Sequence, residues 1–338
     1  MFSEAALGEY LRAHAPGIRG PLAVERLSGG QSNPTYRLRA DSGSYVLRKQ
    51  PDGELLPSAH AVDREYRVIT ALARTDVPVP RTYCYCDDRS VIGTPFFVME
   101  FADGRHFWDP ALPELDAASR AALWDDINSV IGRLHSVDYA AIGLADYGKP
   151  GSYFERQIGR WSKQYRASET EKIDSMDRLI EWLPHNVIAD PASSLVHGDF
   201  RLDNLIVHPT EPRVIAVLDW ELSTLGHPLA DLSYHVMVWR LTPGQFRGMA
   251  GSDFAALSIP TERDYLERYC VRTGRERIDP RDWEFCVVFS MFRLAAIMQG
   301  IAKRVLTGTS ADAGAADVGR RARAIADIAW RQVESIGG

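Results

Sequence analysis

The segment from Val196 to Glu221, VHGDFRLDNLIVHPTEPRVIAVLDWE, constrains the fold of this chain more than any other stretch. It contains two short apolar runs rich in β-branched residues, 205–207 and 214–218, separated by a stretch with two prolines. This pattern predicts two antiparallel strands joined by a turn. Asn204 stands at the entrance of the predicted hairpin and Asp219 at its exit. Because paired strands begin and end side by side, we expect both side chains at one edge of the sheet.

Asp199 precedes Asn204 by five residues and Asp219 by twenty. An alcohol that attacks a phosphoryl group needs a carboxylate to orient it and accept its proton, and Asp199 is the candidate for this catalytic role. A second carboxylate and an amide oxygen are the hard ligands that Mg²⁺ prefers when it bridges phosphate oxygens, so Asn204 and Asp219 are the candidate metal ligands. Taken singly, each residue is more typical of a turn cap, but the joint spacing favours phosphoryl transfer.

The sequence HGDFRLDN resembles the HGDxxxxN motif of the aminoglycoside phosphotransferase and choline kinase superfamily, whose members are distant relatives of protein kinases. VLDWE resembles the metal-binding aspartate segment of the same superfamily. A nearer resemblance is to phosphotransferase domains that occur alone in bacteria or fused to acyl-CoA dehydrogenases. It rests on the segments YVLRKQP, FFVMEFADGR, LHSVDY, HGDFRLDN, VLDWELSTLGHPLADLSY and FRLAAIMQGI, and it extends from about Leu27 to Arg304.

This resemblance implies an α+β, two-lobed protein-kinase-like fold. Residues 1–102 are expected to form a small nucleotide-binding lobe, an antiparallel sheet plus a helix, that ends at a hinge. Residues 103–338 are expected to form a larger, mainly helical lobe for catalysis and substrate binding. From the residue pattern itself, the runs 22–27, 35–39 and 45–49, with glycines between them, predict a meander of strands.

Between the first two predicted strands the chain reads SGGQSN, and the resemblance implies that this loop covers the nucleotide phosphates. Glycines allow backbone N–H groups to approach a phosphate closely. The loop is neither a GxGxxG nor a Walker A sequence, and a Gly-Gly pair is also typical of an ordinary turn. The candidate cofactor-binding residues of the loop are Ser28, Gly29, Gly30, Gln31, Ser32 and Asn33.

The third predicted strand contains two adjacent cations, Arg48 and Lys49. Because side chains alternate across a strand, only one of them faces the nucleotide phosphates. We favour Arg48, since Val46 then shares its face and choline-kinase-like relatives resemble this chain in using arginine. Its partner is expected from the following helix, where Glu65 is the best placed acid. The alternative for Glu65 is a solvated helix charge.

The apolar run 95–101 predicts a buried strand that leads into the hinge implied by the resemblance. Met99 is expected to border the adenine pocket. Glu100 and Ala102 are expected to offer backbone groups to the edge of the base, a contact that requires no particular side chain.

Charged residues of the C-terminal part are candidates for supporting roles. Arg201 lies two residues beyond Asp199, where protein kinases place a lysine on the transferred phosphate, so it is a candidate for charge neutralisation. Asp231 resembles the buried acid that braces the catalytic loop in this superfamily, and we expect it to hold His197 or nearby backbone; a helix-start cap is the alternative. Arg293 sits in an apolar stretch and needs an anionic partner or a strong hydrogen-bond network. A substrate carboxylate or phosphate is one candidate partner, and we favour a structural ion pair.

The acceptor site is expected where generic patterning in the C-terminal part is weakest. Tyr153, Gln157 and Trp161 recur at helical spacing and would form one wall of a pocket. Aromatic residues at this interval are more often part of a core. Both interpretations stay open at the level of sequence.

Composition limits the range of partners. The net charge of −6 over 338 residues lacks the basic footprint of a nucleic-acid-binding protein, so we expect a small-molecule partner. Residues 285–302 are apolar, but Arg293 and Gln299 within them favour a buried helix over a membrane span. The N-terminal residues contain Glu4 and Glu9 without an apolar core, which predicts no secretion signal, and cysteines without a CxxC pair suit a reducing cytoplasm.

The resulting hypothesis is an ATP- and Mg²⁺-dependent phosphotransferase that transfers a γ-phosphoryl group to a hydroxyl of a small molecule. The resemblance to dehydrogenase-fused domains suggests a hydroxylated acid or an acyl thioester as the acceptor. An aminoglycoside kinase is one alternative, and a non-catalytic nucleotide-binding pseudokinase module is another. The sequence leaves open the acceptor, the choice between ATP and GTP, and the oligomeric state.

Overall fold

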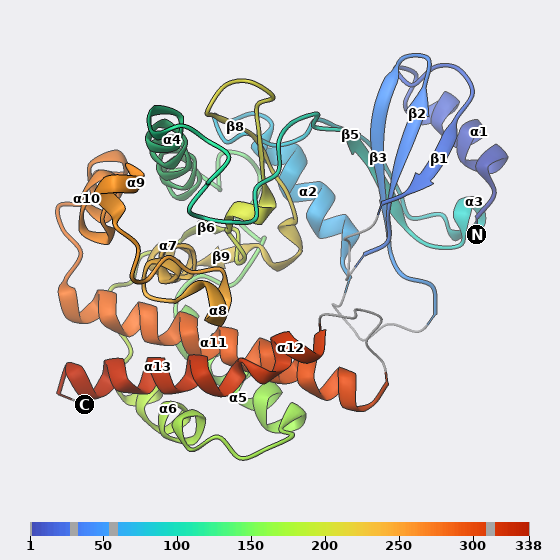
Figure 1. Cartoon of the computed structure of the whole chain (residues 1–338). Helices are drawn as coiled ribbons and strands as arrows, with labels where there is room; N and C mark the ends of the chain where they lie inside the picture. The colour runs from blue at the N-terminus through green and yellow to red at the C-terminus, as the bar shows by residue number, and fades with distance from the viewer. Residues whose placement is uncertain (1, 28–32, 54–59, 309–314, 338) are drawn as a thin grey trace. The chain divides into compact units, whose positions relative to one another are not determined.

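A computed structural model describes residues 2–27, 33–53, 60–308 and 315–337 of the chain (Figure 1). Contacts group the chain into two compact units. The first comprises Met1–His106, Tyr139–Ala145 and Asn204–Ser223, and the second comprises Phe107–Asp138, Asp146–Asp203 and Thr224–Gly338. This grouping differs from a single division after residue 102, because the segment that carries Asn204 and Asp219 belongs to the same unit as the N-terminal sheet.

The first unit is built on a five-stranded antiparallel sheet with the spatial order β1-β2-β3-β5-β4. The strands are β1 (Ala23–Arg26), β2 (Thr35–Ala40), β3 (Gly43–Lys49), β4 (Thr82–Cys86) and β5 (Phe96–Glu100). The helices that accompany them are α1 (Glu4–His14), α2 (Val62–Leu72) and α3 (Arg89–Ile92). The predicted meander is therefore present as β1 to β3, and β5 and β4 extend it.

Helix α1 covers one part of this sheet. Its Leu7 and Leu11 are one helical turn apart and are buried in the same cluster as Leu47 and Phe96 of the strands. Burying a leucine side chain contributes about 1.5–3 kcal/mol, so this pair anchors the helix. The side chain of Ser3 caps the helix by accepting a hydrogen bond from a backbone N–H of the first turn.

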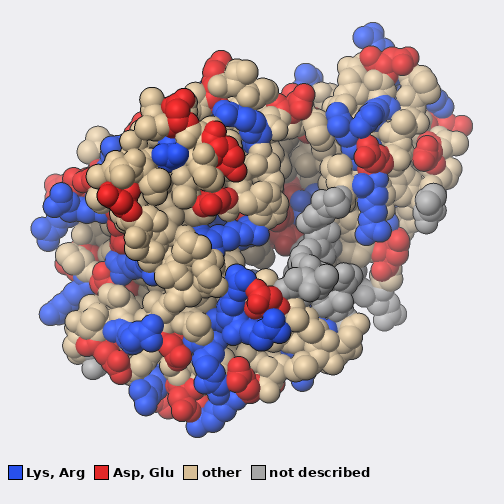
Figure 2. All heavy atoms as spheres, viewed as in Figure 1, with Lys and Arg blue, Asp and Glu red and all other residues tan. Residues whose placement is uncertain are grey.

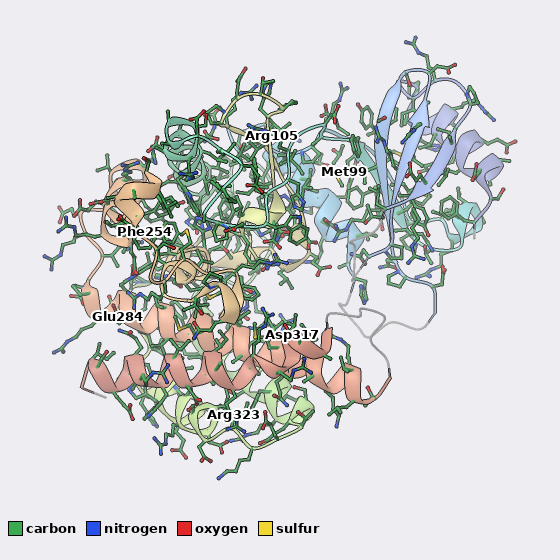
Figure 3. The ribbon with its side chains drawn as sticks, in the orientation of Figure 1. Met99, Arg105, Phe254, Glu284, Asp317 and Arg323 are labelled. Atoms are coloured by element: carbon green, nitrogen blue, oxygen red, sulfur yellow. The ribbon has the colours of Figure 1, made fainter. Side chains whose placement is uncertain are left out.

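The hairpin predicted between Asn204 and Asp219 is present in the first unit. Its strands are β7 (Leu205–Val207) and β8 (Val214–Val217), flanked by the short helices η1 (Leu202–Asn204) and η2 (Trp220–Leu222). Arg105, labelled in Figure 3, adds to the hairpin through two backbone hydrogen bonds with Val207, of 2.7 and 2.9 Å. Gly104 permits this approach, because a Cβ there would lie 2.3 Å from the Val207 carbonyl oxygen.

The second unit is mainly helical. Its longer helices are α4 (Ala117–His135), α5 (Tyr153–Ser168), α6 (Asp174–His185), α7 (Pro228–Val236), α10 (Glu262–Thr273), α11 (Pro280–Leu306) and α13 (Ala322–Ser335). Shorter elements are β6 (Ser194–Val196), β9 (Thr224–Gly226), η3 (Met237–Trp239), α8 (Pro243–Phe246), α9 (Phe254–Leu257) and α12 (Ala315–Arg320). β6 and β9 pair as a small antiparallel ladder. Together with the antiparallel sheet of the first unit, this composition gives the α+β kinase-like architecture expected from the sequence.

Helix α11 is the central helix of this unit and runs beside α13 (Figure 1). Asp279 caps its N-terminus, Pro280 occupies its first turn, and basic residues end it, which are the usual boundary signals of a helix. By length and composition this helix is apolar enough to cross a membrane, but 78% of its most apolar 18-residue stretch is buried inside the protein. The helix is thus a core element on which α5, α7, α12 and α13 pack.

Charged side chains of the second unit pair with opposite charges. Arg240 lies 2.5 Å from Glu262 of α10 and 2.5 Å from Glu284 of α11, and Glu284 is labelled in Figure 3. On the face drawn in Figure 2, acidic and basic groups are interspersed over the helices. The Arg240 cluster therefore ties two helices together.

Candidate active site

Asn204 and Asp219 lie at the same end of the β7 and β8 hairpin. The backbone N–H of Leu218 donates to the carbonyl oxygen of Asn204 at 2.8 Å, which joins the entrance of the hairpin to its exit. Asp219 takes a left-handed conformation, with φ 65° and ψ 59°, at the start of η2. Strained backbone of this kind clusters at functional sites. The side chain of Asp219 is 35% exposed, so part of its surface is accessible to a ligand.

Arg48 of β3 connects this hairpin with helix α2. Its Nε lies 2.9 Å from a carboxylate oxygen of Glu65, and its Nη2 donates to Asp219 at 2.6 Å. Glu221 lies 3.7 Å from the same Nη2. Glu65 comes from α2, Asp219 from the N-cap of η2 and Glu221 from η2 itself, so the guanidinium of Arg48 links β3, α2 and the end of the hairpin. When all four groups are ionised, three negative charges against one positive leave the cluster with an excess of two negative charges.

Burial and charge act in opposite directions within this cluster. Burial by itself lowers the pKa of Arg48, but the neighbouring charges of Glu65 and Asp219 outweigh it and raise that pKa. Burial raises the pKa of Glu65 to about 7, although the charge of Arg48 opposes the shift. Arg48 therefore stays cationic. The adjacent Lys49 instead pairs with Asp52 at 2.7 Å, so Arg48 is the cation that lies among the cluster carboxylates.

The other residues expected around the nucleotide are spread over the first unit. Ser28, Gly29, Gly30, Gln31 and Ser32 lie outside the described residues. Asn33 is buried, and its Oδ1 lies 3.1 Å from Nδ1 of His60. Met99, labelled in Figure 3, is buried on β5 opposite Val46 of β3. The backbone N–H of Glu100 donates to Arg81 at 2.7 Å, and Ala102 follows β5 directly.

In the second unit, Asp199 and Arg201 form a two-pronged ion pair. Nε of Arg201 donates to one carboxylate oxygen of Asp199 at 2.9 Å, and Nη2 donates to the other at 3.1 Å. Nη1 of the same arginine lies 3.3 Å from Asp203, and Asp203 lies 2.5 Å from Arg247. Burial lowers the pKa of Arg201, but the charges of Asp199 and Asp203 prevail and raise it. The four side chains form a chain of alternating charge.

A small pocket lies beside this chain of charges in the second unit. The guanidinium of Arg247 sits 4.4 Å from the ring centre of Trp108, which is 55% exposed. Arg201 lies over the ring of Phe246 at 5.6 Å. The pocket therefore combines two guanidinium groups with aromatic rings. Its lining includes Trp108, Trp124, Arg201, Asp203, Phe246 and Arg247.

Asp231 holds the loop that carries Asp199. Its carboxylate accepts hydrogen bonds from the backbone N–H of His197 at 2.7 Å and of Gly198 at 2.9 Å. His135 of α4 lies 3.3 Å from the same carboxylate. Although burial alone would raise it, these contacts hold the pKa of Asp231 below its ordinary value. Asp231 does not cap the helix, because the N-cap of α7 is His227.

The structure corrects the favoured interpretation of Arg293. The sequence predicts a structural ion pair, but among the described residues Arg293 forms no ion pair with a carboxylate. It donates instead to the carbonyl oxygen of Gly198 and lies over two aromatic rings.

The predicted acceptor wall lies on α5. Tyr153 and Trp161 are buried, at 9% and 6% exposure, and Nε1 of Trp161 donates to the side chain of Gln157 at 3.1 Å. Their burial favours a packing role, and the acceptor contact stays a prediction.

Two partners of the candidate residues, one in each unit, have weak or no signals in the sequence. Glu221 follows Asp219 by two residues within VLDWE, a spacing that would have marked it as part of the same cluster. Arg247 lies 44 residues from its partner Asp203, and no local pattern joins the two.

Comparisons with known proteins show the family and the fold of the chain. Residues 23–280 match the family model described as the phosphotransferase enzyme family. A crystal structure from Ralstonia eutropha, provisionally described as an aminoglycoside phosphotransferase, is 53% identical, with a TM-score of 0.91 and 99% of each chain covered. A ternary complex of a thermostable mutant aminoglycoside phosphotransferase with ADP and hygromycin B has a TM-score of 0.63 at 14% identity, covers 97% of this chain and 98% of that chain, and shows likeness of fold alone.

Acyl-CoA dehydrogenase family member 10 from mouse is 48% identical over 92% of this chain. Member 11 from rat is 43% identical over 91% of it. The chain spans only 29% and 40% of the length of these two relatives. The fold and the family match define a phosphotransferase. The chain belongs to the phosphotransferase enzyme family.

Proposed function

We propose that this protein transfers the γ-phosphoryl group of ATP to a hydroxyl group of a small molecule. The observation that carries the proposal is the ion pair between Arg48 of β3 and Glu65 of α2, with Asp219 on the same guanidinium. In kinases a cation on the third strand and a glutamate on the following helix form such a pair, and the cation contacts the phosphates of the nucleotide. A neighbour in the same fold was crystallised with ADP, which supports a nucleotide as the donor.

The donor set at the hairpin fits Mg²⁺. Asn204 and Asp219 offer oxygen atoms, and Mg²⁺ is typically held by one or two protein ligands together with substrate phosphates. The excess negative charge around Arg48 also favours a divalent cation there. When bound, Mg²⁺ would neutralise charge on the phosphate oxygens. Within the described residues no group of three or more acidic, histidine or cysteine side chains forms a further metal site.

Asp199 is the proposed catalytic base. Its loop is held by the buried Asp231, which limits the positions that the carboxylate can adopt. The guanidinium of Arg201 is paired with the carboxylate of Asp199. Arg201 is also the proposed partner of the transferred phosphoryl group, because a phosphoryl group carries more negative charge than a carboxylate. The retention of Asp199, Asn204 and Asp219 argues against the alternative of a non-catalytic pseudokinase module.

A hydroxylated acid or an acyl thioester is the proposed acceptor. The relatives named as acyl-CoA dehydrogenase family members, which are 43–48% identical to this chain, support this class. The guanidinium groups of Arg201 and Arg247 at the small pocket suit an acceptor that carries a negative group. An aminoglycoside is the second candidate, because the 53% identical crystal structure is provisionally described as an aminoglycoside phosphotransferase.

An ADP-release screen tests the proposed function. Purified protein, Mg²⁺ and either ATP or GTP are combined with hydroxy acids, their thioesters, amino alcohols, sugars and aminoglycosides. We expect acceptor-dependent ADP release that disappears on chelation of Mg²⁺ and in the variant Asp199→Asn. Acceptor-dependent release that persists in that variant would remove Asp199 from its role. A protein that binds Mg·ATP but releases no ADP with any acceptor would favour the pseudokinase alternative.

A further inference from the structure

Gly198, the residue before the proposed base, is held at both of its polar backbone groups. Its N–H donates to Oδ1 of Asp231 at 2.9 Å, and its carbonyl oxygen accepts a hydrogen bond from Nη2 of Arg293. Asp231 belongs to α7 and Arg293 to α11, so side chains from two different helices hydrogen-bond to this one residue. Gly198 has a φ of +82°, a left-handed conformation that a side chain would strain. The backbone leading into Asp199 is therefore fixed from two sides.

The surroundings of Arg293 are unusual for a buried cation. It is 5% exposed, and its guanidinium lies 4.6 Å from the ring centre of Tyr234 and 5.3 Å from that of Trp161. Its Nε has no hydrogen-bond partner among the described residues, and none of their carboxylates forms an ion pair with it. The electron-rich ring faces offset part of the cost of burying this charge.

A purely structural role does not require an arginine at this position. A buried apolar side chain of similar volume packs as well as a buried charge and avoids its desolvation cost. Arg240 in the same unit shows how a structural arginine is held here, because Glu262 and Glu284 both bind it at 2.5 Å. In the part of the chain that the structure describes, no carboxylate pairs with Arg293, which donates instead to the carbonyl oxygen of Gly198, the residue before Asp199.

Electrostatics connect the ring beneath Arg293 with the proposed base. The pKa of Tyr234 is raised to about 12, chiefly by burial and next by the negative charge of Asp199. The charges of Arg201 and Arg293 act on Tyr234 in the opposite direction. Tyr234 thus stays protonated and neutral, and its face can support the guanidinium.

We infer that Arg293 is a positioning residue for the reaction: by holding the carbonyl oxygen of Gly198 it fixes where the carboxylate of Asp199 stands. This role rests on the proposed function. The carboxylate of Asp231 accepts hydrogen bonds from two backbone N–H groups of this loop, and the guanidinium of Arg293 donates one to a carbonyl oxygen of the same loop. Small displacements of a base matter, since an error of about 1 Å can lower a rate by about 10²-fold.

The first experiment needs no turnover. Amide hydrogen exchange is measured on the whole protein for wild type, Arg293→Met, Arg293→Lys and, as a control at a partly buried arginine of the same unit, Arg240→Met. We expect the amides of Gly198 and Asp199 to exchange about 10-fold faster or more in Arg293→Met, and less so in Arg293→Lys. Arg240→Met should loosen α10 and α11 but leave these two amides unchanged. Equal protection of the Gly198 amide in wild type and both Arg293 variants would overturn the inference.

The second experiment uses Mg·ATP turnover, with water as the acceptor when no better one is known. Arg293→Met should lower kcat by about 10²-fold with little change in KM for ATP. In an Asp199→Asn background the same substitution should have little further effect, because its influence acts through Asp199. Additive losses in the double variant, or a change confined to KM, would refute the positioning role. Absence of wild-type turnover would count against the proposed function, while the exchange experiment would still judge Arg293.

Discussion

Nε and Nη2 of Arg201 span the two carboxylate oxygens of Asp199, at 2.9 and 3.1 Å. The charge of the proposed base is thus paired with the charge of its own neighbour. Asp203 offers Arg201 an alternative partner at 3.3 Å, and Arg247 in turn binds Asp203. In the proposed reaction, Arg201 would keep Asp203 as a partner when it leaves Asp199 for the phosphoryl group.

Replacement of Asp199 is expected to separate chemistry from binding. Asp199→Ala should lower turnover by about 10² to 10⁴-fold while affinity for Mg·ATP is retained, because the carboxylate acts on the acceptor hydroxyl. Steady-state kinetics and nucleotide titration provide the two measurements. Asp203→Asn is the matched control, since it also removes a carboxylate from Arg201 but should keep most of the turnover. An unchanged rate in Asp199→Ala would rule out the role.

Loss of Asp219 is expected to uncouple nucleotide binding from metal. A nucleotide at about 100 times its Kd stabilises the folded state by about 2.7 kcal/mol. In Asp219→Ala the Mg²⁺-dependent part of this stabilisation should vanish, as measured by thermal shift with ATP, with and without Mg²⁺. Asp52→Ala removes an exposed carboxylate that pairs with the buried Lys49, away from the proposed metal ligands, and should keep the Mg²⁺-dependent shift of wild type. A wild-type shift in Asp219→Ala would contradict the metal role.

Removal of Arg48 is expected to destabilise the first unit. Arg48→Met leaves Glu65, Asp219 and Glu221 without their cation, and breaking a buried ion pair from one side typically costs about 3–5 kcal/mol. Chemical denaturation measures the change in unfolding free energy. Arg39→Met serves as the comparison, because its pair with Glu25 is more than half exposed and should contribute about 1 kcal/mol or less. An equal decrease in unfolding free energy in the two variants would show that the buried cluster around Arg48 stabilises the protein no more than an exposed ion pair does.

Acidification is expected to destabilise the second unit through two buried histidines. Burial lowers the pKa of His227 to about 4 and that of His235 to about 3. Both values lie below the ordinary pKa of about 6.5, so the unfolded chain binds protons first as pH falls. Above about pH 6.5 both histidines are neutral in the folded and the unfolded chain, and the free energy of unfolding does not depend on them. As pH falls from 6.5 to about 4 for His227 and to about 3 for His235, the free energy of unfolding decreases, by up to about 1.4 kcal/mol per pH unit for each histidine.

Urea denaturation at several pH values between 7 and 4 measures this slope. His235→Gln should flatten it, because the glutamine cannot take up the proton. Replacement of the exposed His14 by glutamine should leave the slope as in wild type. A slope that is identical in His235→Gln and wild type would show that the acid sensitivity arises elsewhere.

The sequence predicted the elements whose signals are local. The hairpin around Asn204 and Asp219 followed from two apolar runs and a proline-containing turn, and the first three strands followed in the same way. The α+β kinase-like fold came from motif resemblance and is confirmed by the architecture. The helix α1 and the strand β4 were not predicted, because short amphipathic stretches carry little periodic signal.

Side-chain partners were harder to predict than elements. The expected ion pair of Arg293 was wrong, since a buried guanidinium can satisfy itself on a carbonyl oxygen and aromatic rings as well as on a carboxylate. The contact between Asp203 and Arg247 joins residues 44 positions apart, and nothing in one sequence selects that pair among many. Alternation along a strand could only state that Arg48 and Lys49 differ in direction.

The hairpin that joins the N-terminal sheet in the first unit has a practical consequence for anyone who wishes to dissect this protein. A protein truncated after residue 106 would lack Val207, the backbone partner of Arg105, and also Asp219 and Glu221, two of the carboxylates that pair with Arg48. The first unit is therefore assembled from three separate segments of the polypeptide, so no single continuous fragment that ends at residue 106 contains all of it.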